Sequence, residues 1–241
     1  MIYIIGIGPG GSPKYLTGRA AEVIGSVGEA IYVGEMIGPG IKGLFAGRNL
    51  ATGRLTITEV NGRLESAINA GRDLAILVPG DPCLYSGQVG RERTVGQYVD
   101  WLRSRRAEFE VIPGVSSWMA LCASAGLDMT EFGTSQAVLV VSLERMLTVS
   151  ADKKLDWDAL GKGCASMPAL VLFQSYAERA ELLSFLSKYY PPDSEVIVGY
   201  KVSWPDEKIL RMPLSSFVRE SLGDDLAKHS IIVILPQKPK P

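Results

Sequence analysis

The chain has 241 residues, 46% of them hydrophobic and 21% charged, so it is long enough to bury a large core in one or two domains. Its 25 Lys and Arg against 26 Asp and Glu leave a net charge of −1, which argues against nucleic acid or an anionic membrane as a partner. One histidine and three widely spaced cysteines argue against a metal site and favour reduced thiols. We therefore expect a cytoplasmic protein with no secretory signal and no membrane span.

Short apolar runs alternate with helix-like segments through the first 112 residues. The expected strands lie within residues 2–8, 29–34, 73–80 and 108–114, and the expected helices cover about 13–24, 59–70 and 87–105. Continuous apolar strands separated by helices are typical of a parallel sheet covered on both faces. The sequence therefore predicts an N-terminal α/β domain over residues 1–112 with a mainly parallel sheet.

The pattern changes in the second half of the chain. Helices are expected over 117–125 and 177–190, and strands within 136–143, 168–175, 194–202, 207–217 and 229–235. The turn residues Trp204, Pro205 and Asp206 join two of these strands as a hairpin, which makes the sheet mixed. We predict a C-terminal α/β domain over 113–241, in which the polar segment 146–167 is a mobile surface segment.

The first expected strand runs directly into a glycine-rich loop. Gly6, Gly8 and Gly11 match the G-x-G-x-x-G pattern of a dinucleotide-binding loop, in which backbone N–H groups and a following helix hold a pyrophosphate. Pro9 stands inside this loop and has no N–H to donate. Two interpretations stay open, a dinucleotide site or a tight turn without a ligand. The acids that would meet the ribose in the first interpretation are Glu22, Glu29 and Glu35.

Two further Gly- and Pro-rich loops follow expected strands. Their sequences are LVPGDPCLYSG at residues 77–87 and VIPGVSSWMA at residues 111–120. In an open parallel sheet, ligands bind outside the carboxyl ends of the strands, so both segments are candidate binding loops. The alternatives are a simple turn for the first and, for the second, capping of the following helix by Ser116 and Ser117.

A resemblance to a known family rests on three segments. These are GIGPGG near the start, PGDPCLYSG near residue 80 and IPGVSS near residue 113. In this order and spacing they resemble the tetrapyrrole methylase family, which methylates porphyrinoid and corrinoid rings with S-adenosylmethionine. The resemblance covers essentially the whole chain. YVGEMI at 32–37 and YKVSWPDEKILR at 200–211 resemble the branch that methylates carbon 11 of precorrin-4 or cobalt-precorrin-4 in cobalamin biosynthesis.

This resemblance implies two α/β domains that hold the methyl donor S-adenosylmethionine, which becomes S-adenosylhomocysteine, in a cleft between them. It also implies a tetrapyrrole substrate, a homodimer, and no metal in catalysis. Carried over position by position, the cofactor contacts are Pro9, Pro79, Gly80, Asp81, Leu84, Ser116, Ser117, Gln174 and Val202. No residue is assigned as catalytic.

The chain departs from the family pattern at several positions. Relatives commonly carry an acidic residue at the position of Gly11, so we expect the fold to tolerate Gly11→Asp. Val78 and Pro79 stand where relatives of the carbon-11 branch usually have polar side chains, and residues 142–167 lack an arginine-rich pattern. Another precorrin position, or uroporphyrinogen III, is therefore an alternative substrate. From other classes, an RNA methyltransferase of the same fold and a non-catalytic cofactor-binding module are the alternatives.

The expected reaction needs no protein nucleophile, because a sulfonium methyl group is already activated and the main tasks are positioning and exclusion of water. Asp81 could bind the ribose or a loop amide, or close its own turn. Trp204 and Tyr85 could stack on the ring or serve as packing aromatics. The candidate cations for the ring carboxylates, which are more simply explained as solvated surface residues, are Arg91, Arg93, Arg103, Arg105, Arg106, Lys201, Lys208 and Arg211.

Overall fold

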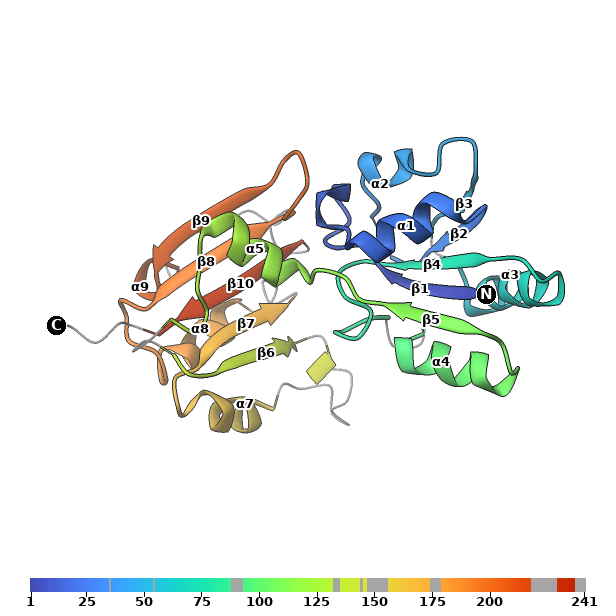
Figure 1. Ribbon diagram of the computed structural model, residues 1–241. Coiled ribbons are helices and arrows are strands. Elements are labelled where there is room, and N and C mark those ends of the chain that lie inside the picture. Colours follow the sequence, from blue (N-terminus) through green and yellow to red (C-terminus); the bar gives the residue numbers. More distant parts are fainter. Residues whose placement is uncertain are drawn as a thin grey trace. The chain divides into compact units, whose positions relative to one another are not determined.

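The computed structural model of the chain divides into two compact units (Figure 1). The first comprises Met1–Ala120 together with Ser203–Pro205, and the second comprises Leu121–Val202 and Asp206–Pro241. That 1–112 and 113–241 are separate domains stays a prediction. The structure describes residues 1–34, 36–53, 55–87, 93–131, 135–143, 145–146, 156–173, 179–217 and 229–236.

The first unit is built on a five-stranded parallel sheet in the order β3-β2-β4-β1-β5. The central strand β1 pairs with both neighbours in register, so that Ile4 lies opposite Ile76 on one side and Val111 on the other. This parallel sheet confirms the expectation from the continuous apolar runs. The strands are β1 (Ile2–Gly6), β2 (Glu29–Tyr32), β3 (Asn49–Ala51), β4 (Leu74–Val78) and β5 (Phe109–Ile112).

Helices cover both faces of this sheet. Ile5 of β1 belongs to the apolar cluster formed with α1 and α2, whereas its neighbour Ile4 belongs to the cluster formed with α3 and α4. Successive strand side chains point to opposite faces, so a strand covered on both sides must be apolar at every position. The helices are α1 (Gly18–Ser26), α2 (Pro39–Gly43), α3 (Ile57–Asn69) and α4 (Val95–Ser104).

The chain leaves β1 and β4 in opposite directions. From β1 it passes through α1 to β2, beyond β4 in the sheet, whereas from β4 it passes through α4 to β5, beyond β1. Right-handed crossovers then require α1 and α4 to lie on opposite faces, as they do. The loops after β1 and β4 therefore diverge at the carboxyl edge, which is where open α/β sheets bind their ligands.

Helix capping explains where the structure departs from the expected first helix. Only Pro13–Tyr15 form a short 3-10 turn, and α1 begins separately because the Thr17 hydroxyl accepts the Ala20 N–H at 3.2 Å. In the same way, the capping box of Thr56 and Glu59 starts α3. The short elements β3 and α2 were not expected from the apolar pattern.

The second unit holds a five-stranded mixed sheet in the order β6-β7-β10-β8-β9. The pair β6–β7 is parallel and the other pairs are antiparallel, with β8 and β9 forming the expected hairpin. None of the described helices has the length and apolar character needed to cross a bilayer. The strands are β6 (Val138–Ser142), β7 (Ala169–Phe173), β8 (Glu195–Tyr200), β9 (Lys208–Pro213) and β10 (Ser230–Leu235). The helices are α5 (Ser117–Ala125), which begins in the first unit, and α7 (Trp157–Cys164), α8 (Arg179–Leu186) and α9 (Leu214–Phe217).

The segment expected to be mobile contains a packed helix instead. Asp156 caps α7 by accepting the Ala159 N–H at 2.9 Å, and Leu160 and Cys164 are buried in the core of the second unit. The expectation was wrong here because a helix of only two turns gives a weak periodic signal. Residues 147–155 lie outside the described part of the chain.

Leu64→Ala should lower the free energy of unfolding by about 2–5 kcal/mol, because Leu64 is fully buried in the α3–α4 cluster. Urea unfolding followed by circular dichroism measures this change. Thr58→Ala, at an exposed position of the same helix, is the control and should change the value by less than about 0.5 kcal/mol. Similar losses in both variants would contradict the described packing of α3.

Candidate active site

Three loops meet at the carboxyl edge of the parallel sheet, where the neighbouring strands β4, β1 and β5 end. The first loop is residues 7–12, the second 79–87 and the third 113–116. The Gly80 N–H donates to the Gly8 carbonyl at 2.6 Å, which joins the first loop to the second. A Cβ at Gly6 would lie 2.6 Å from the Gly114 nitrogen and 2.8 Å from the Gly80 carbonyl oxygen, so all three backbones are in contact.

Asp81 connects the second loop to the third. Its Oδ1 accepts the Cys83 N–H at 2.7 Å and closes the local turn, while Oδ2 accepts the Gly114 N–H at 3.0 Å. Asp81 therefore has both of the roles expected of it within the protein: it closes its own turn, and it accepts a hydrogen bond from a loop amide. Because both oxygens are engaged, Asp81 fixes the distance between the two loops.

The glycines of the apparent dinucleotide fingerprint are explained by contacts within the protein. Gly8 has a φ of +68°, and a Cβ there would lie 2.8 Å from the Cβ of Tyr15. The loop runs into the 3-10 turn Pro13–Tyr15, and the first α-helix begins only at Gly18. A pyrophosphate site needs a helix N-terminus directly at the loop. This geometry favours the tight turn over the dinucleotide site.

The expectation that Gly11→Asp is tolerated was wrong. A Cβ at Gly11 would lie 2.6 Å from Cδ1 of Trp204 and 2.8 Å from the backbone carbonyl carbon of Ser203. Trp204 thus packs against the first loop, which is the packing role considered for it. Nothing in the local sequence around Gly11 signals this contact, because its partner Trp204 is distant in the chain. Ser203 is 192 positions from Gly11, and Trp204, the next residue, is 193 positions away.

Seven of the nine expected cofactor contacts are brought together at this edge. Pro79 is exposed and Ser116 and Ser117 are half-buried. Neither serine hydroxyl has a hydrogen-bond partner among the described residues, so neither caps α5. Val202 is buried in the second unit, and Gln174 lies outside the described residues. The seven are Pro9, Pro79, Gly80, Asp81, Leu84, Ser116 and Ser117.

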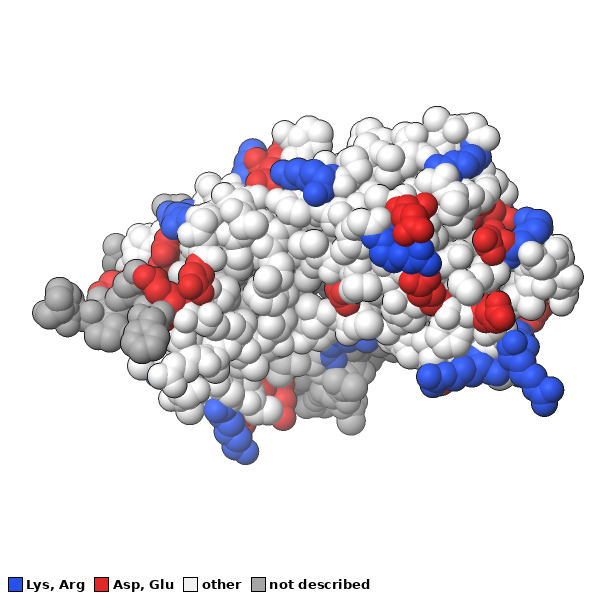
Figure 2. Space-filling view, viewed as in Figure 1, with Lys and Arg blue, Asp and Glu red and all other residues white. Residues whose placement is uncertain are grey.

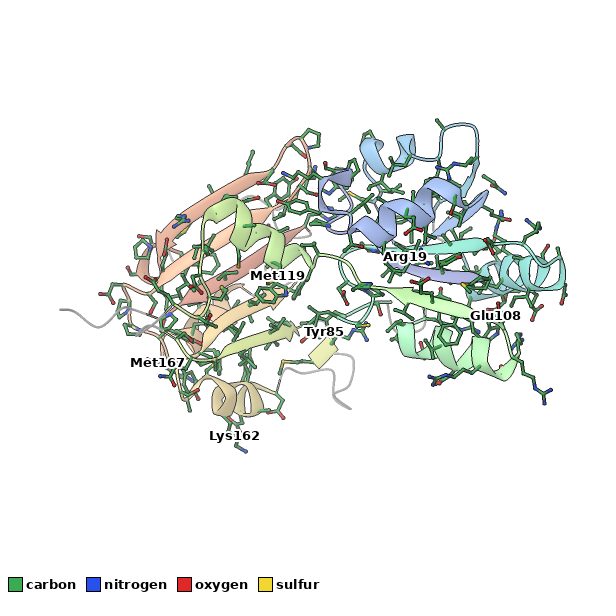
Figure 3. All side chains as sticks on the ribbon, in the orientation of Figure 1. Arg19, Tyr85, Glu108, Met119, Lys162 and Met167 are labelled. Carbon is green, nitrogen blue, oxygen red and sulfur yellow. The ribbon has the colours of Figure 1, made fainter. Side chains whose placement is uncertain are left out.

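Besides Pro79, two side chains of the second loop are exposed. Tyr85 has a left-handed φ of +52° and is exposed (Figure 3), so its stacking on a ring stays a prediction. The neighbouring Cys83 is also exposed. Partial burial, and then the Asp81 carboxylate, raise the pKa of its thiol, so the thiolate that a nucleophile needs is disfavoured.

The described arginine side chains on and beside α4 are not seen to pair with the three loops. Arg93 donates to the Asn61 amide oxygen and lies over the ring of Trp101 at 5.3 Å, and burial lowers its pKa. Arg105 pairs with Glu65 at 2.9 Å at the end of α4, just before β5 begins, and so at the opposite edge of the sheet. Arg103 and Arg106 lie at that same end, and Arg91 is outside the described residues.

Two of the three candidate cations of the second unit pair with carboxylates, whereas Lys208 is exposed at the start of β9. Lys201 pairs with Asp206 at 2.6 Å, and this contact raises the pKa of the lysine and lowers that of the aspartate. Arg211 pairs with Glu195 at 3.0 Å. On the face shown in Figure 2, Lys and Arg are interspersed with Asp and Glu. These observations favour surface ion pairs for the residues concerned.

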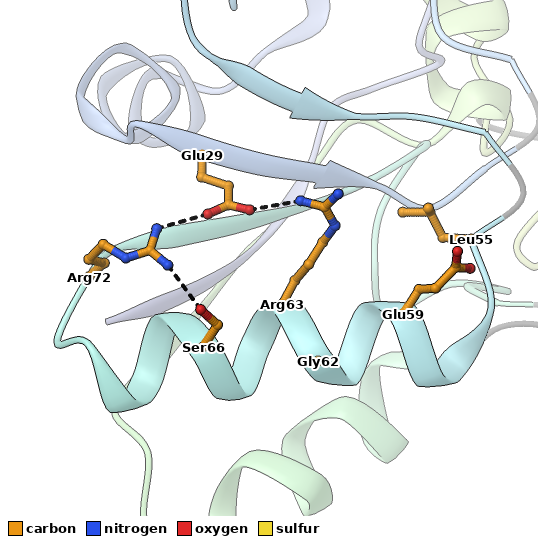
Figure 4. A pocket seen from close by; sticks show the side chains of 7 residues that line it. All are labelled: Glu29, Leu55, Glu59, Gly62, Arg63, Ser66 and Arg72. Atoms are coloured by element: carbon orange, nitrogen blue, oxygen red, sulfur yellow. Dashed lines mark hydrogen bonds and ion pairs between the residues drawn. The ribbon is translucent and has the colours of Figure 1, made fainter.

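A hollow of about 340 Å³ lies beside α3 at the other end of the sheet (Figure 4). Glu29, the first residue of β2, pairs there with Arg63 at 3.1 Å and Arg72 at 3.0 Å. Glu29 is therefore paired with two arginines at the amino edge of the sheet, where it cannot meet a ribose bound at the carboxyl edge. Glu35, another candidate for that role, is outside the described residues.

The sequence that forms these three loops matches a known protein family. The model of the Tetrapyrrole (Corrin/Porphyrin) Methylases matches residues 1–218. The chain belongs to this family. The resemblance inferred from the three glycine-rich segments, and with it the expected fold of two α/β units with one parallel and one mixed sheet, is confirmed.

Individual members of the methylase family are similar over nearly the whole chain. A precorrin-4 C(11)-methyltransferase from Pseudomonas aeruginosa is 24% identical over 234 residues, which is 97% of this chain and 88% of that protein. The crystal structure of a cobalt precorrin-4 methyltransferase of cobalamin biosynthesis matches with a TM-score of 0.80 at 22% identity, covering 97% of this chain and 93% of the other. A uroporphyrin-III C-methyl transferase from Thermus thermophilus, solved with S-adenosyl homocysteine, matches with a TM-score of 0.72 at 22% identity, covering 98% and 91%.

Asp81→Ala should lower the free energy of unfolding by about 1–3 kcal/mol, because the Cys83 and Gly114 amides lose their acceptor. Hydrogen exchange at the Gly114 amide should accelerate in parallel. Urea unfolding and exchange measured by NMR check both effects. Asp100→Ala, an exposed aspartate of the same unit, is the matched control. Unchanged exchange at Gly114 in Asp81→Ala would refute the connecting role.

Proposed function

We propose that the chain is an S-adenosylmethionine-dependent methyltransferase of a corrin-pathway tetrapyrrole, and that it methylates carbon 11 of precorrin-4 or cobalt-precorrin-4. The observation that carries the proposal is the meeting of GIGPGG, PGDPCLYSG and IPGVSS at one sheet edge in a member of the methylase family. The names of the similar proteins support the ring substrate. The residues at the carboxyl edge of the parallel sheet fit the methyl donor.

The second loop leaves one side of its backbone open. Gly80 has a φ of +73°, and among the described residues a Cβ built there meets only Ser116 Cα, at 4.0 Å. A ligand can therefore approach the backbone at Gly80, which a side chain would prevent. The hydroxyl of Ser116 lies on the adjoining loop, and that of Ser117 lies on the first residue of α5. We propose that these residues, with Pro9, Pro79, Asp81 and Leu84, contact the donor, and that Gln174 and Val202 add contacts from the second unit.

The charge of the three loops suits a donor with a sulfonium centre. Asp81 is their one charged residue, so they offer no cation that would repel the sulfonium group. S-adenosylmethionine supplies an electrophilic methyl group. In the transfer, a bond forms between the ring carbon and the methyl carbon while the bond from methyl carbon to sulfur breaks, and S-adenosylhomocysteine remains. The rigid loops contribute by orientation, which is worth on the order of 7–11 kcal/mol in favourable cases.

A different ring substrate is the nearest alternative. The likeness to a uroporphyrin-III methyl transferase favours uroporphyrinogen III as the second candidate. The interspersed charges and the paired cations disfavour the RNA alternative, which would need a basic surface. The homodimer, the cytoplasmic location and the absence of a catalytic metal stay predictions.

Isothermal titration calorimetry should show binding of S-adenosylhomocysteine and none of NAD, because the first loop lacks a helix N-terminus for a pyrophosphate. Leu84→Asp, which places a second carboxylate in the second loop, should change the affinity, whereas Leu55→Asp at a half-buried position beside α3 serves as control. Binding of NAD but not of S-adenosylhomocysteine would overturn the proposal.

Incubation with labelled S-adenosylmethionine and a panel of ring intermediates tests the substrate. We expect label on precorrin-4 or its cobalt form, with the methyl group at carbon 11 located by NMR. Uroporphyrinogen III and ribosomal RNA in separate reactions are the comparison substrates. Label on uroporphyrinogen III alone would select the second candidate, and label on RNA alone would overturn the tetrapyrrole assignment.

A further inference from the structure

The tip of the β8–β9 connection is part of the first unit, although its flanking strands belong to the second. Within the first unit, the indole of Trp204 lies over Gly11, with Cδ1 at 2.6 Å and Cγ at 2.7 Å from the place of a Cβ. The indole therefore occupies the volume in which a side chain of residue 11 would stand. Any residue larger than glycine at this position must displace the indole.

Ser203 adds a polar contact to the same loop. Its Oγ accepts the Gly11 N–H at 3.2 Å, and the residue is buried, with 6% of its surface exposed. Ser203 also has a φ of +75°, in the left-handed region that non-glycine residues rarely adopt. Such a conformation persists only where the surroundings fix it, and it is found at functional sites more often than elsewhere.

The opposite side of the first loop is held as well. The Gly38 N–H donates to the Gly10 carbonyl at 2.8 Å, and a Cβ at Gly38 would collide with the carbonyl oxygens of Gly10 and Gly11. The loop is thus clamped between Gly38 on one side and Ser203 and Trp204 on the other. Pro9 stands directly before Gly10 and directly after Gly8, whose carbonyl accepts from the Gly80 N–H.

We propose that Trp204 and Ser203 are positioning residues, which hold the first loop in the conformation that binds the methyl donor. Gly11 is the partner they require, so an acidic side chain at this position and the indole of Trp204 exclude one another in this chain. This inference rests on the proposed function, because its readout is the affinity for S-adenosylhomocysteine. A loop held before binding loses less conformational freedom when the ligand arrives.

A double-mutant cycle tests the proposal by calorimetry with S-adenosylhomocysteine. Gly11→Ala should weaken binding by at least 10-fold, because the methyl group displaces the indole and moves the loop. Trp204→Ala should weaken it severalfold by releasing the loop. The double variant should bind better than Gly11→Ala alone, because the clash with the indole is removed and only the one with the Ser203 carbonyl carbon, at 2.8 Å, remains. Ser203→Ala should weaken binding, and thermal unfolding of every variant reports whether it is folded.

Trp101→Ala is the matched control, because Trp101 packs under Arg105 on α4, away from the three loops. It should lower the unfolding midpoint and leave the affinity unchanged. Unchanged affinity in folded Gly11→Ala, or strictly additive losses in the cycle, would overturn the positioning role while leaving the proposed function intact. Absence of binding by the unaltered protein would instead overturn the proposed function, and the positioning role with it.

Discussion

Backbone segments from three neighbouring strands pass one another in direct contact at the carboxyl edge of the parallel sheet. Gly6, at the end of β1, faces the Gly114 nitrogen and the Gly80 carbonyl at distances that leave no room for a Cβ. A hydrogen bond from Gly80 to Gly8 and the two bonds accepted by Asp81 then lock the loops together. The candidate site depends on this approach, because it brings segments from residues 7–12, 79–87 and 113–116 to one place.

The winding of the chain explains why these loops lie where open α/β sheets bind their ligands. Because α1 and α4 cover opposite faces, the connections after β1 and β4 turn away from each other. The loops themselves remain close, since Asp81 and the glycine contacts hold them. The result is a rigid and nearly uncharged edge, with an open backbone at Gly80 and two serine hydroxyls beside it. Such an edge suits a reaction in which the protein positions two reactants and supplies no nucleophile.

Much of this could be predicted from the sequence, because the signals are local. Continuous apolar runs predicted the strands of both sheets except the short β3, and the loop sequences predicted which strand ends carry the candidate site. The first helix and α7 were missed in part, since Thr17 and Asp156 set helix starts that apolar periodicity does not mark. The contact of Trp204 with Gly11 joins residues that only the tertiary structure brings together, so no local pattern could reveal it. This contact also contradicts the expectation that the fold tolerates Gly11→Asp.

Hydrogen exchange with and without S-adenosylhomocysteine, read by mass spectrometry, tests the central claim most directly. The account predicts that the ligand slows exchange in peptides covering residues 7–12, 79–87 and 113–117 together. It also predicts no change at the end of α4 or around Glu29, which lie at the other edge of the sheet. Protection confined to those distant regions, or to one loop alone, would contradict the assignment of a single site formed by three loops.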